Sequence, residues 1–416
     1  MVGQRIRYYR KTKGLTQEEL AQGICSVSYL SKIEKGDAKS SEEVINLLCE
    51  RLGISPEEVD NNEVLEFLNE WNLLMTSRKF DEASEKFPQV KEKVSSVRDP
   101  NILIRYKLFC SRYYLVLEEP DLQSCFSLLE EVKGFYEQLS PELRFYYYVF
   151  WGMYANYNNN YKEALEYLHS AENQYISNLK VNELDIAVLY YLLALTYNFL
   201  MRINSVTNYA YKAISIFDSE YNYSRSADCQ VLLGISYRRA KNYSQAEFHL
   251  KQALKYSTSF KDDFLSGVIY HNLGYVNSCK NDNLQAIEYY KKSLLYKDSQ
   301  SDEKKSNTLF LLATEYFNLG DYDKALKLIE QGFEFVTTGS EVYYHLTILK
   351  LRIEQKSDEF ENLLVKIAIP FFEKRNIWEY VSKYSELLAD MYFDQSSYKK
   401  ASQYYRIANN GRKNIF

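Results

Sequence analysis

Proline is missing from more than half of this chain, and its absence constrains the fold more than any other sequence feature. The 416 residues contain six prolines, and none falls in the 228 residues from Glu142 to Ile369. Because proline is the strongest helix breaker, a proline-free run of this length indicates one helix after another. Glycine is also scarce, with 14 residues, which argues against β-sandwiches, β-barrels and glycine-loop nucleotide folds. The sequence therefore predicts an all-α fold.

Charge is distributed unevenly along the chain, although the whole chain is mildly acidic with a net charge of −5. Residues 1–39 carry eight Lys and Arg against four acids, and residues 40–70 carry one Arg against nine acids. A small basic region followed at once by an acidic one indicates a local nucleic-acid-binding face on a chain that is not a general polyanion binder.

Sequence signals for a membrane or for secretion are missing. The six cysteines are scattered without a CxxC pair, as expected of reduced and mostly buried thiols in a cytosol. The N-terminus has no apolar signal core, and no segment approaches the length of apolar sequence that a membrane span requires. We therefore expect a cytoplasmic protein that makes no membrane contact.

The first sixty residues contain several helix start signals separated by short turns. Thr16 and Glu19 form a capping box at the start of one helix, and Ser26 caps the next helix, expected over residues 27–34. Two further capping boxes are expected, at Ser40 with Glu43 and at Ser55 with Glu58. Short helices joined by tight turns are typical of a helix-turn-helix.

The run GLTQEELAQGICSVSYLSKIEKG, residues 14–36, resembles the repressor/Cro-type helix-turn-helix of the xenobiotic-response-element class. The resemblance implies that the third helix enters the major groove and that its N-terminal side chains read base edges. The base-reading residues that it implies are Ser26, Val27, Ser28, Tyr29 and Lys32. It further implies a phosphate or base-edge contact by Gln17. The phosphate contacts that it implies are Arg5, Arg10 and Lys35.

We expect this DNA-binding domain to span residues 1–60. Its small core is expected to consist of Leu20, Ala21, Leu30, Ile33, Val44 and Leu48. An alternative interpretation is a helix-turn-helix that has lost DNA binding and serves only as a docking domain. If the domain does bind DNA, specific recognition implies a dimer on paired half-sites, because a single copy binds weakly.

A repeated pattern of small and aromatic residues fills the remainder of the chain. Its clearest copy consists of Gly234, Tyr237, Tyr243, Ala246 and Ala253. Nine copies, spaced 36 to 42 residues apart, have these anchor residues: Trp71, Tyr113, Gly152, Ala194, Gly234, Gly274, Ala313, Leu349 and Ala389. The pattern resembles the tetratricopeptide repeat. It implies a second domain over residues 61–416, a right-handed superhelix of about nine helical pairs in which most tyrosines pack between repeats.

In tetratricopeptide repeats the first helix of each pair lines a concave groove, so the resemblance also implies which residues face that groove. These peptide-binding candidates are Asn156, Asn198, Asp228, Arg238, Arg239, His271, Asn272, Tyr275, Asn307 and Asn318. An asparagine amide can donate to and accept from an extended peptide backbone at once, and nearby charges add selectivity. Each asparagine taken singly is also consistent with a solvated polar residue, and only the set favours a peptide groove.

Enzyme and metal-site motifs are missing from the sequence. It contains no glycine-rich phosphate loop and no nucleophile motif, and its four histidines are dispersed without zinc-ligand spacing. We therefore expect no enzymatic activity, no cofactor and no metal ion.

The order of the two domains resembles one family, the peptide-pheromone regulators of Gram-positive bacteria in the Rap/Rgg/NprR/PlcR/PrgX group, and within it the NprR type. The resemblance implies a quorum-sensing transcription regulator that binds a short re-imported signalling peptide in its groove. Peptide binding would change the homo-oligomeric state (dimer or tetramer) and the binding of a double-stranded DNA operator. The alternative that it implies is a Rap-like interaction protein, which sequesters a sporulation phosphorelay response regulator when peptide-free.

Overall fold

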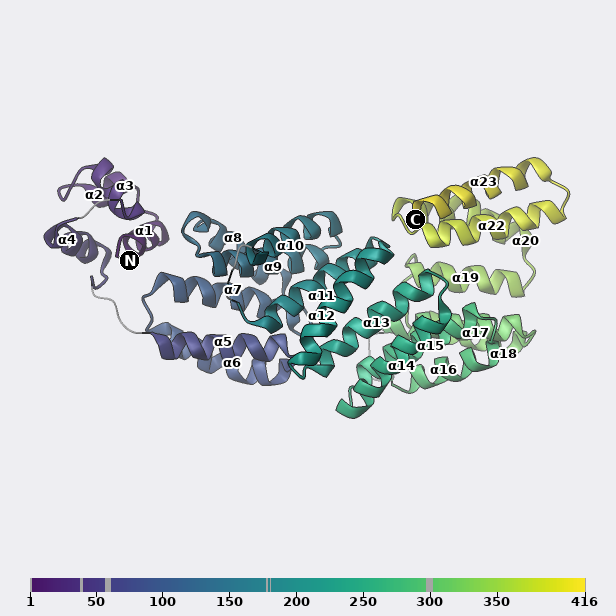
Figure 1. The fold of residues 1–416 in the computed structure, drawn as a ribbon. Helices are drawn as coiled ribbons and strands as arrows, with labels where there is room; N and C mark the ends of the chain where they lie inside the picture. The colour runs from purple at the N-terminus through teal and green to yellow at the C-terminus, as the bar shows by residue number, and fades with distance from the viewer. Residues whose placement is uncertain are drawn as a thin grey trace. The chain divides into compact units, whose positions relative to one another are not determined.

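Helices joined by short turns make up the computed structural model, which describes residues 2–37, 40–56, 61–176, 179, 181–296 and 302–415 (Figure 1). These residues contain no strand, and the predicted all-α fold class is confirmed. None of the helices in these ranges combines the length and the hydrophobicity that a membrane crossing needs.

The first four helices are α1 (Val2–Thr12), α2 (Gln17–Ala21), α3 (Val27–Lys35) and α4 (Glu42–Leu52), and side-chain caps mark the starts of α2, α3 and α4. The capping box of Thr16 and Glu19 is present at α2, because each side chain accepts a hydrogen bond from the other residue's backbone N–H. Ser26 caps α3 by accepting from the backbone N–H of Tyr29. Both predictions are confirmed.

The predicted start of the fourth helix is wrong by one residue. Ser41, and not Ser40, is the N-cap of α4, and its hydroxyl accepts from the backbone N–H of Val44. Two adjacent serines offer the same capping group, so the sequence alone did not distinguish them. The capping box predicted at Ser55 includes Glu58, which lies outside the described residues.

The core of this helix-turn-helix consists of the predicted apolar residues together with several others. The predicted residues that are buried are Leu20, Ala21, Leu30, Ile33 and Leu48. The sixth, Val44, is partly buried and packs against them. The structure adds Ile6 of α1 and three residues of α4 to this cluster, Ile45, Cys49 and Leu52. Burial of these side chains stabilises the arrangement of the four short helices.

Nine helical pairs follow within the described residues, with one predicted anchor on the first helix of each pair. The pairs are α5 (Asn62–Thr76) with α6 (Phe80–Ser95), α7 (Pro100–Val116) with α8 (Leu122–Lys133), α9 (Pro141–Tyr157) with α10 (Tyr161–Ile176), α11 (Glu183–Phe199) with α12 (Ile203–Ser219), α13 (Tyr223–Arg239) with α14 (Tyr243–Phe260), α15 (Asp263–Cys279) with α16 (Asn283–Leu295), α17 (Asp302–Asn318) with α18 (Tyr322–Phe333), α19 (Glu341–Ile353) with α20 (Ser357–Leu363), and α22 (Trp378–Asp394) with α23 (Tyr398–Ile415). The eighth pair is irregular, because a π-helical turn (Leu364–Ala368) and α21 (Ile369–Lys374) continue from α20.

Three anchor glycines are sites of close helix contact. A Cβ atom at Gly152 would lie 2.7 Å from Leu168, and one at Gly234 would lie 2.6 Å from Leu250. A Cβ atom at Gly274 would lie 2.5 Å from the ring of Tyr290. These separations are too short for a side chain, so glycine allows the two helices of each pair to approach closely. The interpretation of these glycines as helix contacts and not turn residues is confirmed.

The chain divides into two compact units. Unit 1 comprises Met1–Thr196 and Ser215–Arg225, and unit 2 comprises Tyr197–Ile214 and Ser226–Phe416. Unit 1 thus contains the helix-turn-helix and the first repeats, and unit 2 contains the later repeats. Each unit has its own buried clusters, for example around Leu388 in unit 2 and Leu48 in unit 1. The predicted domain boundary at residue 60 stays a prediction.

Candidate functional site

The N-terminal half of α3 presents a row of exposed side chains. The exposed residues among the predicted DNA contacts are Ser26, Val27, Ser28, Lys32 and Lys35. Tyr29 is partly buried and packs against the core of the helix-turn-helix. Side chains at the start of α3 are therefore accessible to base edges, and we keep this surface as the candidate DNA interface.

Two of the predicted phosphate contacts are corrected by the structure. Arg10 is buried, and its Nε and NH2 groups donate to the Glu34 carboxylate at 2.6 and 3.0 Å. Arg5 is also buried and donates to the carbonyl oxygen of Ser55 at 2.8 Å. Buried guanidinium groups engaged in this way hold the helices of the domain together and do not face solvent, where DNA would lie. Gln17 is half-buried, and its amide nitrogen donates to Glu34 at 2.8 Å.

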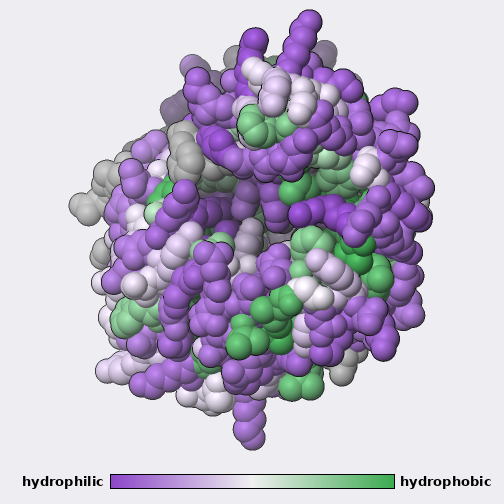
Figure 2. All heavy atoms as spheres, turned by 90° about the vertical axis from the view of Figure 1, so that its right-hand side faces the viewer, coloured by the Kyte–Doolittle hydropathy of each residue, from purple (hydrophilic) through white to green (hydrophobic). Residues whose placement is uncertain are grey.

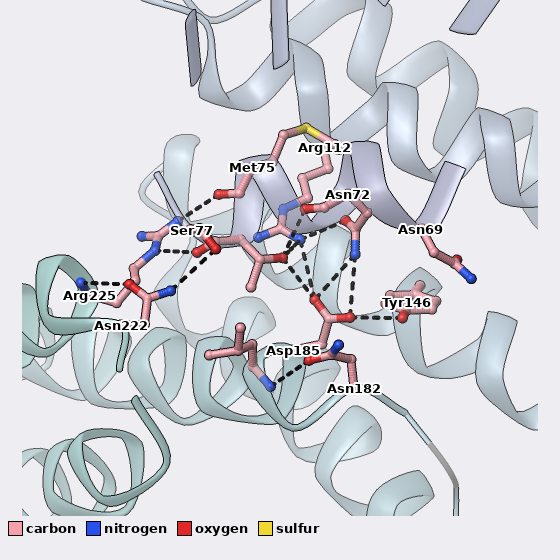
Figure 3. Close-up of polar contacts among 12 residues, drawn as sticks. Asn69, Asn72, Met75, Ser77, Arg112, Tyr146, Asn182, Asp185, Asn222 and Arg225 are labelled. Atoms are coloured by element: carbon pink, nitrogen blue, oxygen red, sulfur yellow. Dashed lines mark hydrogen bonds and ion pairs between the residues drawn. The ribbon is translucent and has the colours of Figure 1, made fainter. Parts of the chain in front are cut away.

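A buried polar network joins the first helices of the repeats in unit 1 (Figure 3). The Asp185 carboxylate of α11 accepts hydrogen bonds from Tyr146 Oη at 2.8 Å and from Thr76 Oγ1 at 3.0 Å. The amide of Asn72 donates to both carboxylate oxygens at 3.3 Å. Arg112, which is almost fully buried, lies 3.5 Å from Asp185 and donates to Asn72 Oδ1 at 2.7 Å. Side chains of α5, α7, α9 and α11 therefore meet at one carboxylate.

Arg225 extends this network to the C-terminal end of α5. Its Nε donates to the Thr76 carbonyl at 2.7 Å, and its NH2 donates to the Met75 carbonyl at 3.0 Å (Figure 3). A cation at this position satisfies carbonyl groups that a helix end leaves without partners. Burial lowers the pKa of Arg112, in the same network, to about 10. These side chains are engaged with one another, and we assign the network a structural role.

Charged and aromatic side chains meet in unit 2 where the C-terminal parts of α13 and α15 approach the start of α22. Arg238 of α13 lies 4.0 Å from the ring centroid of Tyr275 of α15, which is close enough for a cation–π interaction. Glu379 of α22 accepts a hydrogen bond from Tyr275 Oη at 3.1 Å and lies 3.9 Å from Arg238 NH1. The structure therefore places two of the predicted groove residues, Arg238 and Tyr275, side by side and adds Glu379 to them.

Several other predicted groove residues contact neighbouring repeats. Arg239 NH1 donates to the side-chain and backbone oxygens of Asn198 at 2.7 and 2.8 Å. His271 Nδ1 lies 2.9 Å from Thr308 Oγ1. In unit 1, Asn156 donates to Thr196 at 2.9 Å. These contacts link the first helices of successive repeats, so these polar side chains also stabilise the stacking of the repeats.

The remaining candidates differ in how their polar groups are used. Asn272 is half-buried, and its Nδ2 donates to the Val268 carbonyl of its own helix at 2.9 Å, which leaves its amide oxygen as an acceptor. Asp228 and Asn307 are also half-buried, and Asn318 is exposed. Among the predicted groove residues, only Asn156 lies in unit 1. The candidate groove is therefore a feature of unit 2.

A cavity of about 230 Å³ lies beside these residues in unit 2. Its lining residues come from α15, α17, α19 and α22: Ser278, Phe310, Thr314, Asn318, His345, Ile348, Leu349, Arg352, Lys383 and Tyr384. Asn318 is the predicted groove residue in this lining. Figure 2 shows the side of the molecule on which α17 and α22 lie, where the surface is hollowed near its centre and hydrophilic side chains border the hollow.

Sequence reasoning missed Arg352, Glu379 and Lys383. Lys383 lies six residues before the anchor Ala389, just as the predicted groove residues Asp228 and Asn307 lie six residues before their anchors Gly234 and Ala313. The same spacing could therefore have identified Lys383. Arg352 and Glu379 do not occupy such positions. Their proximity to the groove depends on how α19 and α22 pack against the earlier helices of unit 2.

A buried carboxyl group in α17 lies close to this cluster. Glu315 is 1% exposed, and neither of its carboxylate oxygens makes a hydrogen bond with the described residues. Burial raises the pKa of Glu315 above its usual value, because the charged form loses its hydration. Its negative charge therefore opposes folding once the pH rises above the pKa that this group has in the unfolded chain.

We expect the Glu315→Gln substitution to raise the melting temperature of unit 2 at pH 8. The substitution should increase the free energy of unfolding at this pH, and the gain should disappear as the pH falls below about 4.5, where the carboxyl becomes protonated in the unfolded chain as well. Thermal melts of both proteins over this pH range measure the effect. Glu359→Gln, at an exposed position in α20, is the matched control and should change nothing. A gain that is equal at both pH values would contradict the assignment.

Comparisons with known proteins agree with this architecture. A helix-turn-helix family model matches residues 6–59. The transcriptional activator NprA of Geobacillus stearothermophilus is 36% identical over 406 residues, which cover 95% of this chain and 99% of NprA. The regulatory protein RapD of Bacillus subtilis is 24% identical, over 82% of this chain and 96% of RapD.

Solved structures show the same fold. The apo form of the quorum sensor NprR from B. thuringiensis superposes with a TM-score of 0.73 at 23% identity, over 84% of this chain and 99% of that chain. NprR in complex with its cognate peptide NprX gives a TM-score of 0.64 at 24% identity, over 83% and 98% of the two chains. Together with the match to NprA along nearly the whole of both chains, these findings show that the chain belongs to the NprR/Rap group of Gram-positive peptide-pheromone regulators.

Proposed function

We propose that this protein is a transcription regulator that binds operator DNA through α3 and is controlled by a short signalling peptide bound in unit 2. The observation that carries the proposal is the similarity to NprA, a transcriptional activator by name, which covers 95% of this chain. Because the similarity includes both the helix-turn-helix and the repeats, the DNA-binding surface and the groove belong to one regulator. This role requires no active site, and it places the protein in the cytoplasm.

DNA recognition in this proposal depends on the exposed start of α3. Ser26, Val27, Ser28 and Lys32 would read base edges, and Lys35 would contact phosphate. A single recognition helix contacts few base pairs, so the regulator would act as a dimer or a tetramer on paired half-sites. We assign residues 1–60 to DNA binding and residues 61–416 to peptide binding and oligomerisation.

Peptide recognition is assigned to the inner helices of unit 2. NprR, which shares this fold, has a structure in complex with its cognate peptide NprX. In this proposal Asn272 and Asn318 would bind the backbone of an extended peptide; the Asn272 amide nitrogen is used within its own helix, so Asn272 would act through its amide oxygen, and Asn318 lines the cavity. The peptide can change DNA binding only by the difference in its affinity for the two states of the regulator.

A mobility-shift assay tests this function. The purified full-length protein is incubated with DNA from its own promoter region, with and without the peptide fraction of medium conditioned by the producing strain. We expect a retarded complex whose midpoint protein concentration changes when the peptide fraction is added. If no complex forms under either condition, the protein is not a DNA-binding regulator of its own promoter.

A second role rests on the similarity to the Rap proteins. The response regulator aspartate phosphatase H of Bacillus subtilis is 23% identical over 82% of this chain and 92% of its own length. By analogy, the peptide-free protein would bind a sporulation response regulator through its repeats. Co-purification of a response regulator from lysate without peptide, and its release by the peptide fraction, would support this role.

A further inference from the structure

We propose that the cavity of unit 2 binds a carboxylate group of the signalling peptide between Arg352 and Lys383. This inference rests on the proposed function, because it assumes that a peptide occupies unit 2. The carboxylate is either the C-terminus of the peptide or the side chain of one of its Asp or Glu residues. Both sources offer the same chemistry to two cations, and the experiment below distinguishes them.

The cavity of unit 2 is lined by two cations. Arg352 extends from α19 and Lys383 from α22, and both line the cavity. Within the described residues, neither lies in an ion pair with a carboxylate, and Arg352 instead lies 4.7 Å from the ring centroid of Phe317. Some other cations of unit 2 are paired with a carboxylate. Lys350, for example, is paired with Glu330 at 2.6 Å.

Charge around Lys383 favours an anion in the cavity. Desolvation lowers the pKa of Lys383, and the positive charge of Arg352 acts in the same direction, while the negative charges of Glu379 and Glu315 oppose the shift without cancelling it. Glu379, one turn before Lys383 on α22, is also engaged with Tyr275 and Arg238. Glu315, the other acid near Lys383, has a raised pKa. A bound carboxylate would therefore relieve the repulsion between the two cations.

The size and lining of the cavity fit one residue of a peptide. A volume of about 230 Å³ holds a single side chain or a terminal residue and not a whole peptide. Phe310, Ile348 and Leu349 supply an apolar wall for the aliphatic part, while the Ser278 hydroxyl and the Asn318 amide can donate to an oxygen. A carboxylate held by a guanidinium, an ammonium and neutral donors makes strong charge-assisted hydrogen bonds.

The experiment uses the full-length protein and the peptide fraction of conditioned medium. One half of the fraction is methyl-esterified, which neutralises C-terminal and side-chain carboxyls alike. Each half is incubated with the protein, and the peptides that the protein retains are counted by mass spectrometry. Any retained peptide is then synthesised in four versions. These are the free acid, the C-terminal amide, a version with Asp and Glu replaced by Asn and Gln, and a doubly changed peptide that combines the amide with these replacements. Isothermal titration measures the Kd of each version.

We expect esterification to abolish retention and the doubly changed peptide to bind at least tenfold more weakly than the free acid. The amide and the Asn/Gln version then identify which carboxylate enters the cavity. The double substitution Arg352→Gln with Lys383→Gln should weaken the free acid at least tenfold and should not weaken the doubly changed peptide further. Lys399→Gln, at an exposed position of α23, is the control and should leave the Kd unchanged.

The outcomes separate the two proposals. If wild-type protein retains no peptide, peptide binding itself fails and this inference fails with it. If it retains peptides with and without carboxylates equally, or if the double substitution leaves the Kd of the free acid unchanged, peptide binding stands and only the carboxylate site is overturned. The comparison of esterified and unmodified peptides uses wild-type protein, so it holds even if a variant does not fold.

Discussion

Replacing Asp185 with asparagine will lower the free energy of unfolding of unit 1 by about 3–5 kcal/mol. The carboxylate is the partner of Arg112 at 3.5 Å and accepts hydrogen bonds from Thr76 and Tyr146 (Figure 3). Arg112 is 1% exposed, so removing the negative charge leaves a buried guanidinium without a counter-ion. An amide of the same shape cannot replace the charge, and its NH2 group cannot accept the hydrogen bonds that one carboxylate oxygen accepts now.

Urea denaturation followed by tryptophan fluorescence measures this loss, because Trp71 and Trp151 lie in unit 1 and only Trp378 lies in unit 2. The control is Glu63→Gln, which removes a carboxylate paired with Lys93 at 2.7 Å but 84% exposed. An exposed ion pair contributes about 0–1 kcal/mol to the free energy of unfolding, so the urea midpoint of this variant should be close to that of the wild type. Equal midpoints for the two variants would show that the network does not stabilise unit 1.

The double substitution Ser28→Ala with Lys32→Ala will reduce specific binding to promoter DNA by about 10- to 100-fold, since a good base-edge contact contributes about 1–3 kcal/mol. Both side chains are exposed on α3 and neither belongs to the core of the domain. The fold of the domain and the affinity for peptide should therefore be unchanged. Titration of the labelled promoter fragment in a mobility-shift assay, with unlabelled non-specific DNA as competitor, measures the change.

The control for this experiment is Lys13→Ala. Lys13 is exposed and follows α1, outside the recognition helix. Its removal takes away one positive charge and should weaken specific and non-specific binding to a similar small extent. If Lys13→Ala reduces specific binding as much as the double substitution does, α3 contributes only charge and does not read the sequence.

Local interactions made the helices of this protein predictable. The capping box of Thr16 and Glu19 depends on residues three positions apart, and it forms as expected. The close contact of Gly274 with the ring of Tyr290 follows from a repeat whose two helices are adjacent in the chain. Where two neighbouring residues offer the same group, as Ser40 and Ser41 do, the boundary was missed by one position.

Contacts between distant residues were not predictable in the same way. Arg10 carries the charge that a phosphate contact needs, yet the fold buries it against Glu34. Whether an arginine faces DNA or a carboxylate of its own domain depends on which face of α1 packs inward. Asn156 and Arg239 were expected in a peptide groove, and in the structure they bond to neighbouring repeats.

By itself the sequence determined the all-α class, the helix-turn-helix and the nine repeats, because helix propensity, capping and close helix packing act over a few residues or within one repeat. Only the tertiary structure decided that Asp185 joins four helices of unit 1 and that Glu379 of the last repeat meets Arg238 and Tyr275. Only the tertiary structure decided, in the same way, that Arg352 and Lys383 line one cavity. Which side chains meet across a unit depends on how successive repeats stack, and small rotations accumulate from one repeat to the next.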